Sequence, residues 1–150
     1  MLTAESTGFW GTRYTVAENG IPVTTWDNDW WKSGGTFELA GRAYHVRSTM
    51  WGSRFTMLDS GGAVVAEAER VGHKNWTVVA GGRVYGFRRV SMFKGEQHLM
   101  DGERPVGVIK QTGILSGNLS ADLPGLPLPL QVFVLAVLIV HWQNSNASGG

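Results

Sequence analysis

Apolar residues follow two patterns along this chain: short alternating runs over most of its length, and one continuous run near its end. The continuous run, Val132–Val140, has no polar side chain over nine residues. Pro124, Pro127 and Pro129 stand just before it, and proline is accepted in the first turn of a helix but not in its interior. The run is also longer than a typical buried strand, so the pattern predicts a helix over about residues 129–143.

The surroundings of this segment decide the fold. A helix that is apolar on every face belongs inside a protein or inside a membrane. About 15 residues rise only ~22 Å, which is shorter than the ~30 Å core of a bilayer, so burial inside the protein is favoured. Two alternatives stay open. One is a membrane anchor, and the other is a strand, because five of the residues are β-branched, namely Val132, Val134, Val137, Ile139 and Val140.

Turn signals divide the rest of the chain at an almost constant interval. Five residue pairs suited to tight turns are spaced by 21, 21, 20 and 20 residues: Asn19-Gly20, Ala40-Gly41, Gly61-Gly62, Gly81-Gly82 and Asp101-Gly102. Such residues accept the positive φ of hairpin turns, and the interval leaves about eight residues for each strand. The chain before residue 120 is therefore predicted to be a meander of about ten to twelve strands.

Alternation of side chains assigns the faces of these strands. One predicted inner face carries Phe37, Leu39, Tyr44 and Val46, and another carries the small residues Val64, Ala66 and Ala68. Small inward residues leave room for a bulky filler, and the C-terminal run is the candidate. We therefore predict a mainly β fold, a closed or nearly closed antiparallel barrel of about 12 strands with a C-terminal hydrophobic helix through its centre. The predicted domain covers residues 1–143, followed by a polar, disordered tail over 144–150.

Composition and charge narrow the functional classes. The net charge of +1 gives no global field that would attract nucleic acid. Cysteine is absent, which fits a reducing compartment. The first twenty residues contain no apolar segment of the secretory kind, so no signal peptide is predicted. We expect a cytoplasmic protein, with peripheral association with a membrane as an open option.

The positive charge is concentrated in the middle of the chain. Residues 70–110 hold eight Lys and Arg against three Asp and Glu, whereas residues 1–69 hold five against eight. Four of the basic residues form the candidate binding cluster for an anionic head group: Arg83, Arg88, Arg89 and Lys94. Arginine binds phosphate through paired donors. The alternative is a solvated edge strand whose charges prevent aggregation.

Other candidate chemistry is weaker. The segment Trp26–Trp31 combines three tryptophans with two aspartates, which suits a ligand platform or an aromatic plug at one end of the barrel. The histidines lack metal-ligand spacing and are expected to be structural; they are His45, His73, His98 and His141. No nucleophile motif or pair of catalytic acids occurs, so we expect no enzymatic activity, no cofactor and no metal.

In the order of its segments, the chain resembles the tubby C-terminal-like superfamily, which includes tubby domains, phospholipid scramblases and LURP-one-related proteins. The segments that carry the resemblance are Tyr44–Arg47, Phe55–Asp59 with the Gly61-Gly62 turn, Trp76, Gly107–Lys110 and the leucine-proline run into Val132–Val140. The resemblance implies a twelve-stranded barrel around a hydrophobic helix, with phosphoinositide binding in tubby domains and lipid movement in scramblases. The chain lacks the cysteine cluster of scramblases.

These observations predict a non-enzymatic intracellular binding or scaffold module, with an anionic phospholipid head group or a protein as its partner. The alternative is a membrane-anchored, scramblase-like protein that uses the C-terminal hydrophobic segment as its anchor. A third possibility is a carrier of small molecules, which requires an open space inside the barrel.

Overall fold

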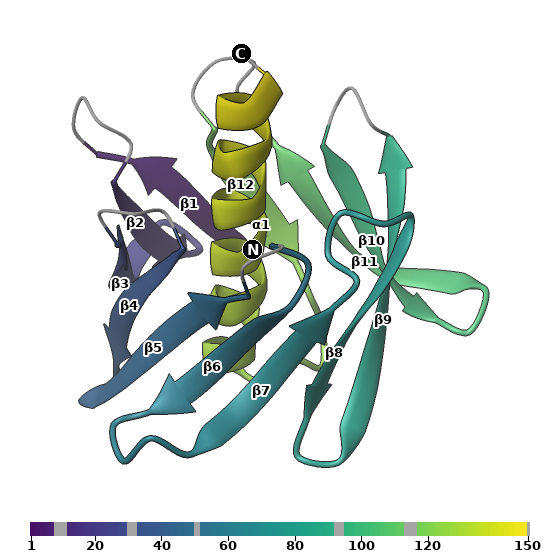
Figure 1. Ribbon diagram of the computed structural model, residues 1–150. Coiled ribbons are helices and arrows are strands. Elements are labelled where there is room, and N and C mark those ends of the chain that lie inside the picture. The colour runs from purple at the N-terminus through teal and green to yellow at the C-terminus, as the bar shows by residue number, and fades with distance from the viewer. Residues whose placement is uncertain (8–11, 30–32, 50–51, 92–94, 113–116, 150) are drawn as a thin grey trace.

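A computed structural model describes residues 1–7, 12–29, 33–49, 52–91, 95–112 and 117–149. Within these residues the chain forms one closed antiparallel barrel and one helix (Figure 1). The strands are β1 (Leu2–Ser6), β2 (Arg13–Glu18), β3 (Ile21–Asn28), β4 (Gly34–Leu39), β5 (Arg42–Ser48), β6 (Phe55–Asp59), β7 (Val64–Glu69), β8 (Asn75–Ala80), β9 (Arg83–Ser91), β10 (Glu96–Asp101), β11 (Arg104–Gln111) and β12 (Leu119–Asp122), and the helix is α1 (Leu128–Gly149).

Strands adjacent in sequence pair with each other all the way around the barrel. The ring closes where β1 pairs with β12 as well as with β2, with Leu2 opposite Ala121 on one side and Glu18 on the other. The predicted turns are present, and positive φ occurs at Asn19, Ala40 and the glycine of each pair. The predicted barrel of about twelve strands is confirmed.

The helix α1 lies inside this ring (Figure 1). Every residue of Val132–Val140 is between 0% and 2% exposed and belongs to one hydrophobic core shared with the strands. Small residues of the wall, including Ala4, Ala66 and Ala68, are also buried in that core. Small side chains on the wall leave the volume that a helix with large side chains fills at native packing density. The predicted central helix is therefore confirmed.

The start of α1 agrees with the proline pattern. The amides of Leu130 and Gln131 both donate to the carbonyl oxygen of Pro127, at 2.9 and 3.0 Å. The side chain of Gln131 donates from Nε2 to the carbonyl oxygen of Leu126, at 2.8 Å. Pro127 and Pro129 lie where the first turn of a helix has no partner for its amides, so the missing N–H groups cost little.

The end of α1 differs from the prediction. The helix continues to Gly149 instead of ending near Gln143. No proline follows Pro129, and glycine appears only at the last two positions. Once burial of the middle of a helix has nucleated it, each further residue is added at little cost. The polar side chains that follow Gln143 therefore do not end the helix.

Val64 also differs from its predicted place. It was expected inside with Ala66 and Ala68, but it is 55% exposed. The ladder between β6 and β7 shifts register between Met57 and Leu58, so Met57 is opposite Ala66 and Leu58 is opposite Val64. A bulge of one residue exchanges the faces of the positions beyond it. Val65 packs against the core in its place.

Candidate functional site

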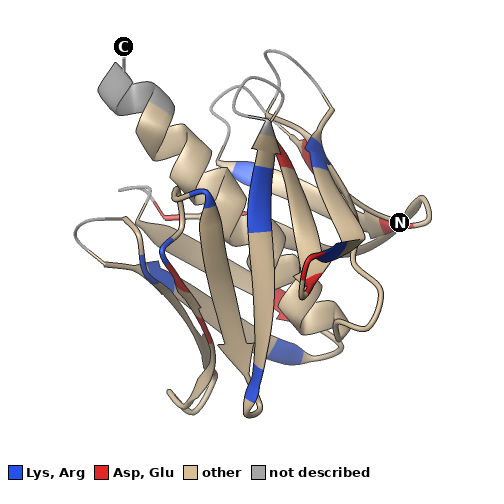
Figure 2. Ribbon diagram, turned by 90° about the vertical axis from the view of Figure 1, so that its right-hand side faces the viewer, with Lys and Arg blue, Asp and Glu red and all other residues tan. Residues whose placement is uncertain are grey.

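The basic residues predicted as one cluster lie at both ends of β9. Arg83 is the first residue of this strand, whereas Arg88 and Arg89 lie close to its other end. Arg89 lies six positions after Arg83 along the strand, which corresponds to about 20 Å at ~3.3 Å per residue. Figure 2 shows the positive residues at the two ends of this strand. Lys94 lies outside the described residues.

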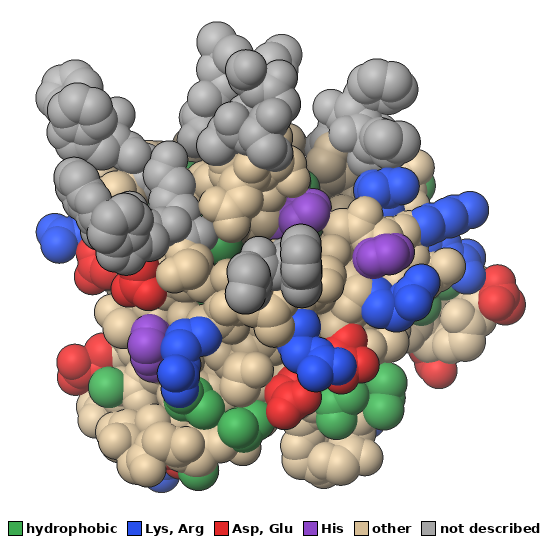
Figure 3. Space-filling view, viewed as in Figure 1, with side chains coloured by type: hydrophobic (Ala, Val, Ile, Leu, Met, Phe, Trp, Pro, Cys, Tyr) green, Lys and Arg blue, Asp and Glu red, His purple; other side chains and the backbone are tan. Residues whose placement is uncertain are grey.

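The upper end of the barrel in Figure 1, where α1 ends, carries the larger positive surface. The loop after β7 brings Arg70 and Lys74 beside Arg88 and Arg89, because the amide of Arg89 donates to the carbonyl oxygen of Lys74 at 2.7 Å. Positive side chains gather over this loop and the adjoining part of β9 (Figure 3). We call Arg70, Lys74, Arg88 and Arg89 the basic rim. Arg70 and Lys74 were not among the predicted binding residues, and their signal in the sequence was the excess of positive charge that begins at residue 70.

Few protein contacts neutralise the basic rim. Arg88 donates to Asn75 Oδ1 at 3.3 Å and to Glu103 Oε2 at 3.4 Å, but the Glu103 side chain is 91% exposed, so this ion pair is worth little. Arg89 donates from Nη1 to the carbonyl oxygen of Gly72 at 3.1 Å. Arg70 and Lys74 make no ion pair within the described part of the chain. The rim therefore keeps most of its positive charge available to a ligand.

His141 connects the end of α1 to the same loop. A Cβ at Gly72 would lie 2.7 Å from His141 Cε1, so the imidazole packs directly on the backbone of the loop. Burial lowers the pKa of His141, and the positive charge of Arg89 lowers it further. The imidazole is therefore held in its neutral form, as expected for a ring between packed backbone and a cation. The contact fixes the loop of the basic rim to the central helix.

On another side of the barrel, half-buried polar groups tie the helix to the wall. Gln143 donates from Nε2 to the hydroxyl of Tyr14 at 3.3 Å, and Asn28 donates from Nδ2 to Gln143 Oε1 at 2.8 Å. Trp26 donates from Nε1 to Asn28 Oδ1 at 2.6 Å. Burial raises the pKa of Tyr14, and the hydrogen bond with Gln143 partly offsets that rise. These bonds set the rotation of α1 within the ring.

The network also decides the role of the aromatic segment at residues 26–31. Trp26 is buried completely in the core, as a plug would be and a ligand platform would not. Asp27 is paired with Arg13 at 2.7 Å and is not directed at a ligand. Trp30 and Trp31 lie outside the described residues. The described part of this segment therefore has a structural role.

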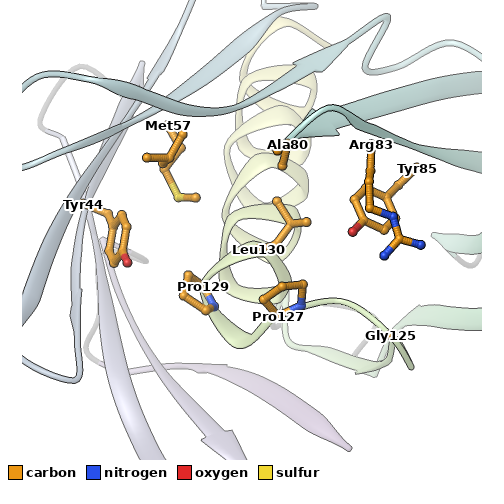
Figure 4. Close-up of a pocket in the computed structure, with 11 residues that line it drawn as sticks. Tyr44, Met57, Ala80, Arg83, Tyr85, Gly125, Pro127, Pro129 and Leu130 are labelled. Carbon is orange, nitrogen blue, oxygen red and sulfur yellow. The ribbon is translucent and has the colours of Figure 1, made fainter.

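The lower end of the barrel, where α1 begins, contains an apolar pocket of about 370 Å³ (Figure 4). We call it the lower pocket. Arg83 and Tyr85 lie on one side of it and Tyr44 lies on the other, with Leu130 and Pro129 of α1 between them. These residues come from strands and a helix that are distant in sequence, and no local motif marks them.

Of the described residues that line the lower pocket, Arg83 alone is charged. Its guanidinium lies over the ring of Tyr85, 5.5 Å from the ring centroid, which orients it by a cation–π contact. It makes no ion pair with any residue that the structure describes. Tyr44 is stacked on Phe37 at 5.0 Å between ring centroids, so the opposite side of the pocket is also held in place.

A seam in the barrel wall leads to the lower pocket from outside. The ladder between β7 and β8 joins Glu67–Glu69 to Thr77–Val79 in the described structure, although β7 begins at Val64 and β8 ends at Ala80. A shallow groove on the outer surface shares Val65, Ala80 and Gly81 with the pocket. The two strands therefore separate beside the pocket.

Two of the remaining histidines, His98 and His45, lie near carboxylates. His98 lies 2.9 Å from Glu96, and His45 lies 3.8 Å from Asp29. The described ranges contain no group of three His, Asp or Glu side chains placed to hold a metal ion.

No family model matches the chain, and no curated protein and no solved structure is significantly similar to it. The resemblance to tubby-like proteins stays a prediction, while the fold that it implies is the fold observed. What the protein binds is therefore inferred from the geometry at the two ends of the barrel.

Proposed function

We propose that the protein is a non-enzymatic intracellular binding module that recognises anionic phospholipid head groups through the basic rim. The observation that carries the proposal is the gathering of Arg70, Lys74, Arg88 and Arg89 at one end of the barrel, with only one exposed ion pair among them in the described structure. Arginine and lysine at this density suit phosphate groups. Each basic residue near an anionic membrane surface adds about 1 kcal/mol.

The position of the rim supports contact with a surface. It lies at one mouth of the closed barrel, on the loop after β7 and the adjoining end of β9 (Figure 3). The loop that carries Arg70 and Lys74 is anchored by Val71, which is buried and whose amide donates to the carbonyl oxygen of Ser53 at 3.0 Å. An anchored loop loses little conformational freedom when it binds, which favours affinity.

Co-sedimentation with vesicles tests the proposal. Vesicles of phosphatidylcholine alone serve as the reference, and vesicles containing phosphatidylserine or phosphoinositides are the ligand. The double variant Arg70→Ala/Lys74→Ala removes two charges that make no described ion pair, so the fold is retained and binding is expected to fall about thirtyfold, or ~2 kcal/mol. Added salt should weaken binding by the wild type.

A matched control removes two positive charges elsewhere. Arg42→Ala/Arg83→Ala has the same net charge as the rim variant but leaves the rim complete, so its vesicle binding should stay close to that of the wild type. Equal binding by the rim variant and the wild type would rule out head-group recognition at this surface. A protein partner would then be the better explanation of the exposed charge.

The rival proposal is a membrane-anchored, scramblase-like protein. By length and composition one helix could cross a bilayer, the segment Leu128–Ser145 with a mean hydropathy of 1.3, but 56% of this segment is buried inside the protein. That burial counts against the anchor, since the same side chains cannot contact both the barrel and lipid. Alkaline carbonate extraction separates the two proposals, because a peripheral barrel is released and an anchored protein stays with the membrane.

A further inference from the structure

We propose that the lower pocket is a second binding site, independent of the basic rim, for an anionic amphiphile with a single apolar chain. The chemical class is that of the long-chain carboxylates. In this arrangement the chain lies in the pocket beside the start of α1, and the carboxylate contacts Arg83 at the edge of the pocket (Figure 4).

The lining of the pocket selects an apolar chain. Met57, Val65 and Leu130 face it from two strands and the helix, and the rings of Tyr44 and Tyr85 close its sides. Burial of methylene groups against such side chains is favourable in proportion to the area removed from water. A volume of about 370 Å³ is near the lower limit of small-molecule pockets, so the site suits one chain and not the two chains of a phospholipid.

The charge of the pocket selects an anion. In the described part of the chain no Asp or Glu lines it, and Arg83 is the single charged residue there. Its Cζ lies over the Tyr85 ring, 5.5 Å from the ring centroid, and it makes no ion pair with any described residue, so its N–H groups can bind a carboxylate. Pro127 and Pro129 have no N–H, so the first turn of the helix offers few competing donors. The hydroxyls of Tyr44 and Tyr85 are neutral donors, so among the described lining residues only Arg83 offers the carboxylate a positive charge.

The seam between β7 and β8 provides a route into the site. Val65, Ala80 and Gly81 border both the pocket and the outer groove, and the paired part of the two strands stops short of them. Val64 and Val79 are exposed beside the same groove. A flexible chain can enter between the strands with its apolar part against these valines, while the carboxylate stays in water until it meets Arg83.

Isothermal titration calorimetry with dodecanoate, below its micelle concentration and at pH 8, tests the proposal. The wild type is expected to bind one dodecanoate per chain, and Arg83→Gln is expected to bind it at least about tenfold more weakly. Dodecanol, which has the same chain and no charge, should bind the wild type and Arg83→Gln equally. Circular dichroism of each mixture checks that the barrel stays folded.

Two further variants separate the pocket from the rest of the surface. Ala80→Phe places a ring in the pocket and should abolish binding of both dodecanoate and dodecanol. Arg47→Gln removes an exposed positive charge of β5 that does not line the pocket and should bind dodecanoate like the wild type. The proposal is overturned if the wild type does not bind, if it binds many dodecanoate molecules, or if Arg83→Gln or Ala80→Phe binds like the wild type. Vesicle binding by the basic rim is tested separately with Arg70→Ala/Lys74→Ala, so either proposal can fail while the other stands.

Discussion

Replacement of Leu135 by alanine measures how firmly the barrel holds its central helix. Leu135 lies in the middle of α1 and is 1% exposed. The change removes apolar contacts and leaves a cavity inside a closed ring of strands, where the ladders on every side limit collapse around the gap. Leu→Ala at buried sites costs about 2.7–5.0 kcal/mol, and where the surroundings collapse least the cost is near the upper end, about 4 kcal/mol.

Equilibrium unfolding in guanidinium chloride, followed by tryptophan fluorescence and far-UV circular dichroism, measures this cost. A domain of this size has a stability of about 5–15 kcal/mol, so the variant should remain folded in water. The control is Val84→Ala on the outside of β9, where the side chain is 66% exposed and the expected change is within ~0.5 kcal/mol. A change equally small for Leu135→Ala, with an unchanged slope, would refute burial of the helix.

Two other features of the core give further predictions. Trp76→Phe keeps an aromatic ring against Phe87 but removes the Nε1 donor, 2.9 Å from Gln97 Oε1; leaving buried Gln97 without this partner should cost about 1–3 kcal/mol in the same unfolding experiment, and no loss would mean that water replaces the indole. The second concerns pH. Because the folded state lowers the pKa of His141 below its ordinary value of 6.5, the unfolded chain binds the proton more tightly. The contribution of neutral His141 to the free energy of unfolding is therefore complete above pH 6.5 and declines as the pH falls below 6.5. Denaturant midpoints at pH 8 and pH 5 should differ less in His141→Gln than in the wild type, and an equal difference would contradict the assignment.

The fold could be predicted because its local signals agree with one another. Turn pairs such as Asn19-Gly20 and Gly81-Gly82 each occupy a tight turn of the barrel with positive φ, and their spacing sets the length of the strands. The apolar run Val132–Val140 could be placed in a helix because it is too long for a strand, and inside the barrel because the wall carries small residues; the length argument against a membrane span does not hold for the whole helix. A fold can be predicted from its sequence where the local patterns and the whole fold agree.

What could not be predicted depends on irregularities and on distant contacts. The bulge opposite Met57 turns Val64 outward, and alternation alone does not reveal where a bulge occurs. The four basic residues of the predicted cluster were close in sequence, but an extended strand places Arg83 far from Arg89. The lower pocket is formed by residues as far apart as Tyr44 and Leu130, which only the closed ring brings together.

The central claim, that the barrel encloses its C-terminal helix, is tested most directly by native-state hydrogen exchange of the helix amides. A helix surrounded by strands can exchange its amides only when the barrel opens. The amides of Val132–Val140 should therefore exchange with the same free energy as global unfolding, measured with denaturant, and no faster than those of β5 and β6. Rapid exchange of the helix while these strands stay protected would show that the helix leaves the intact barrel, and would contradict the account.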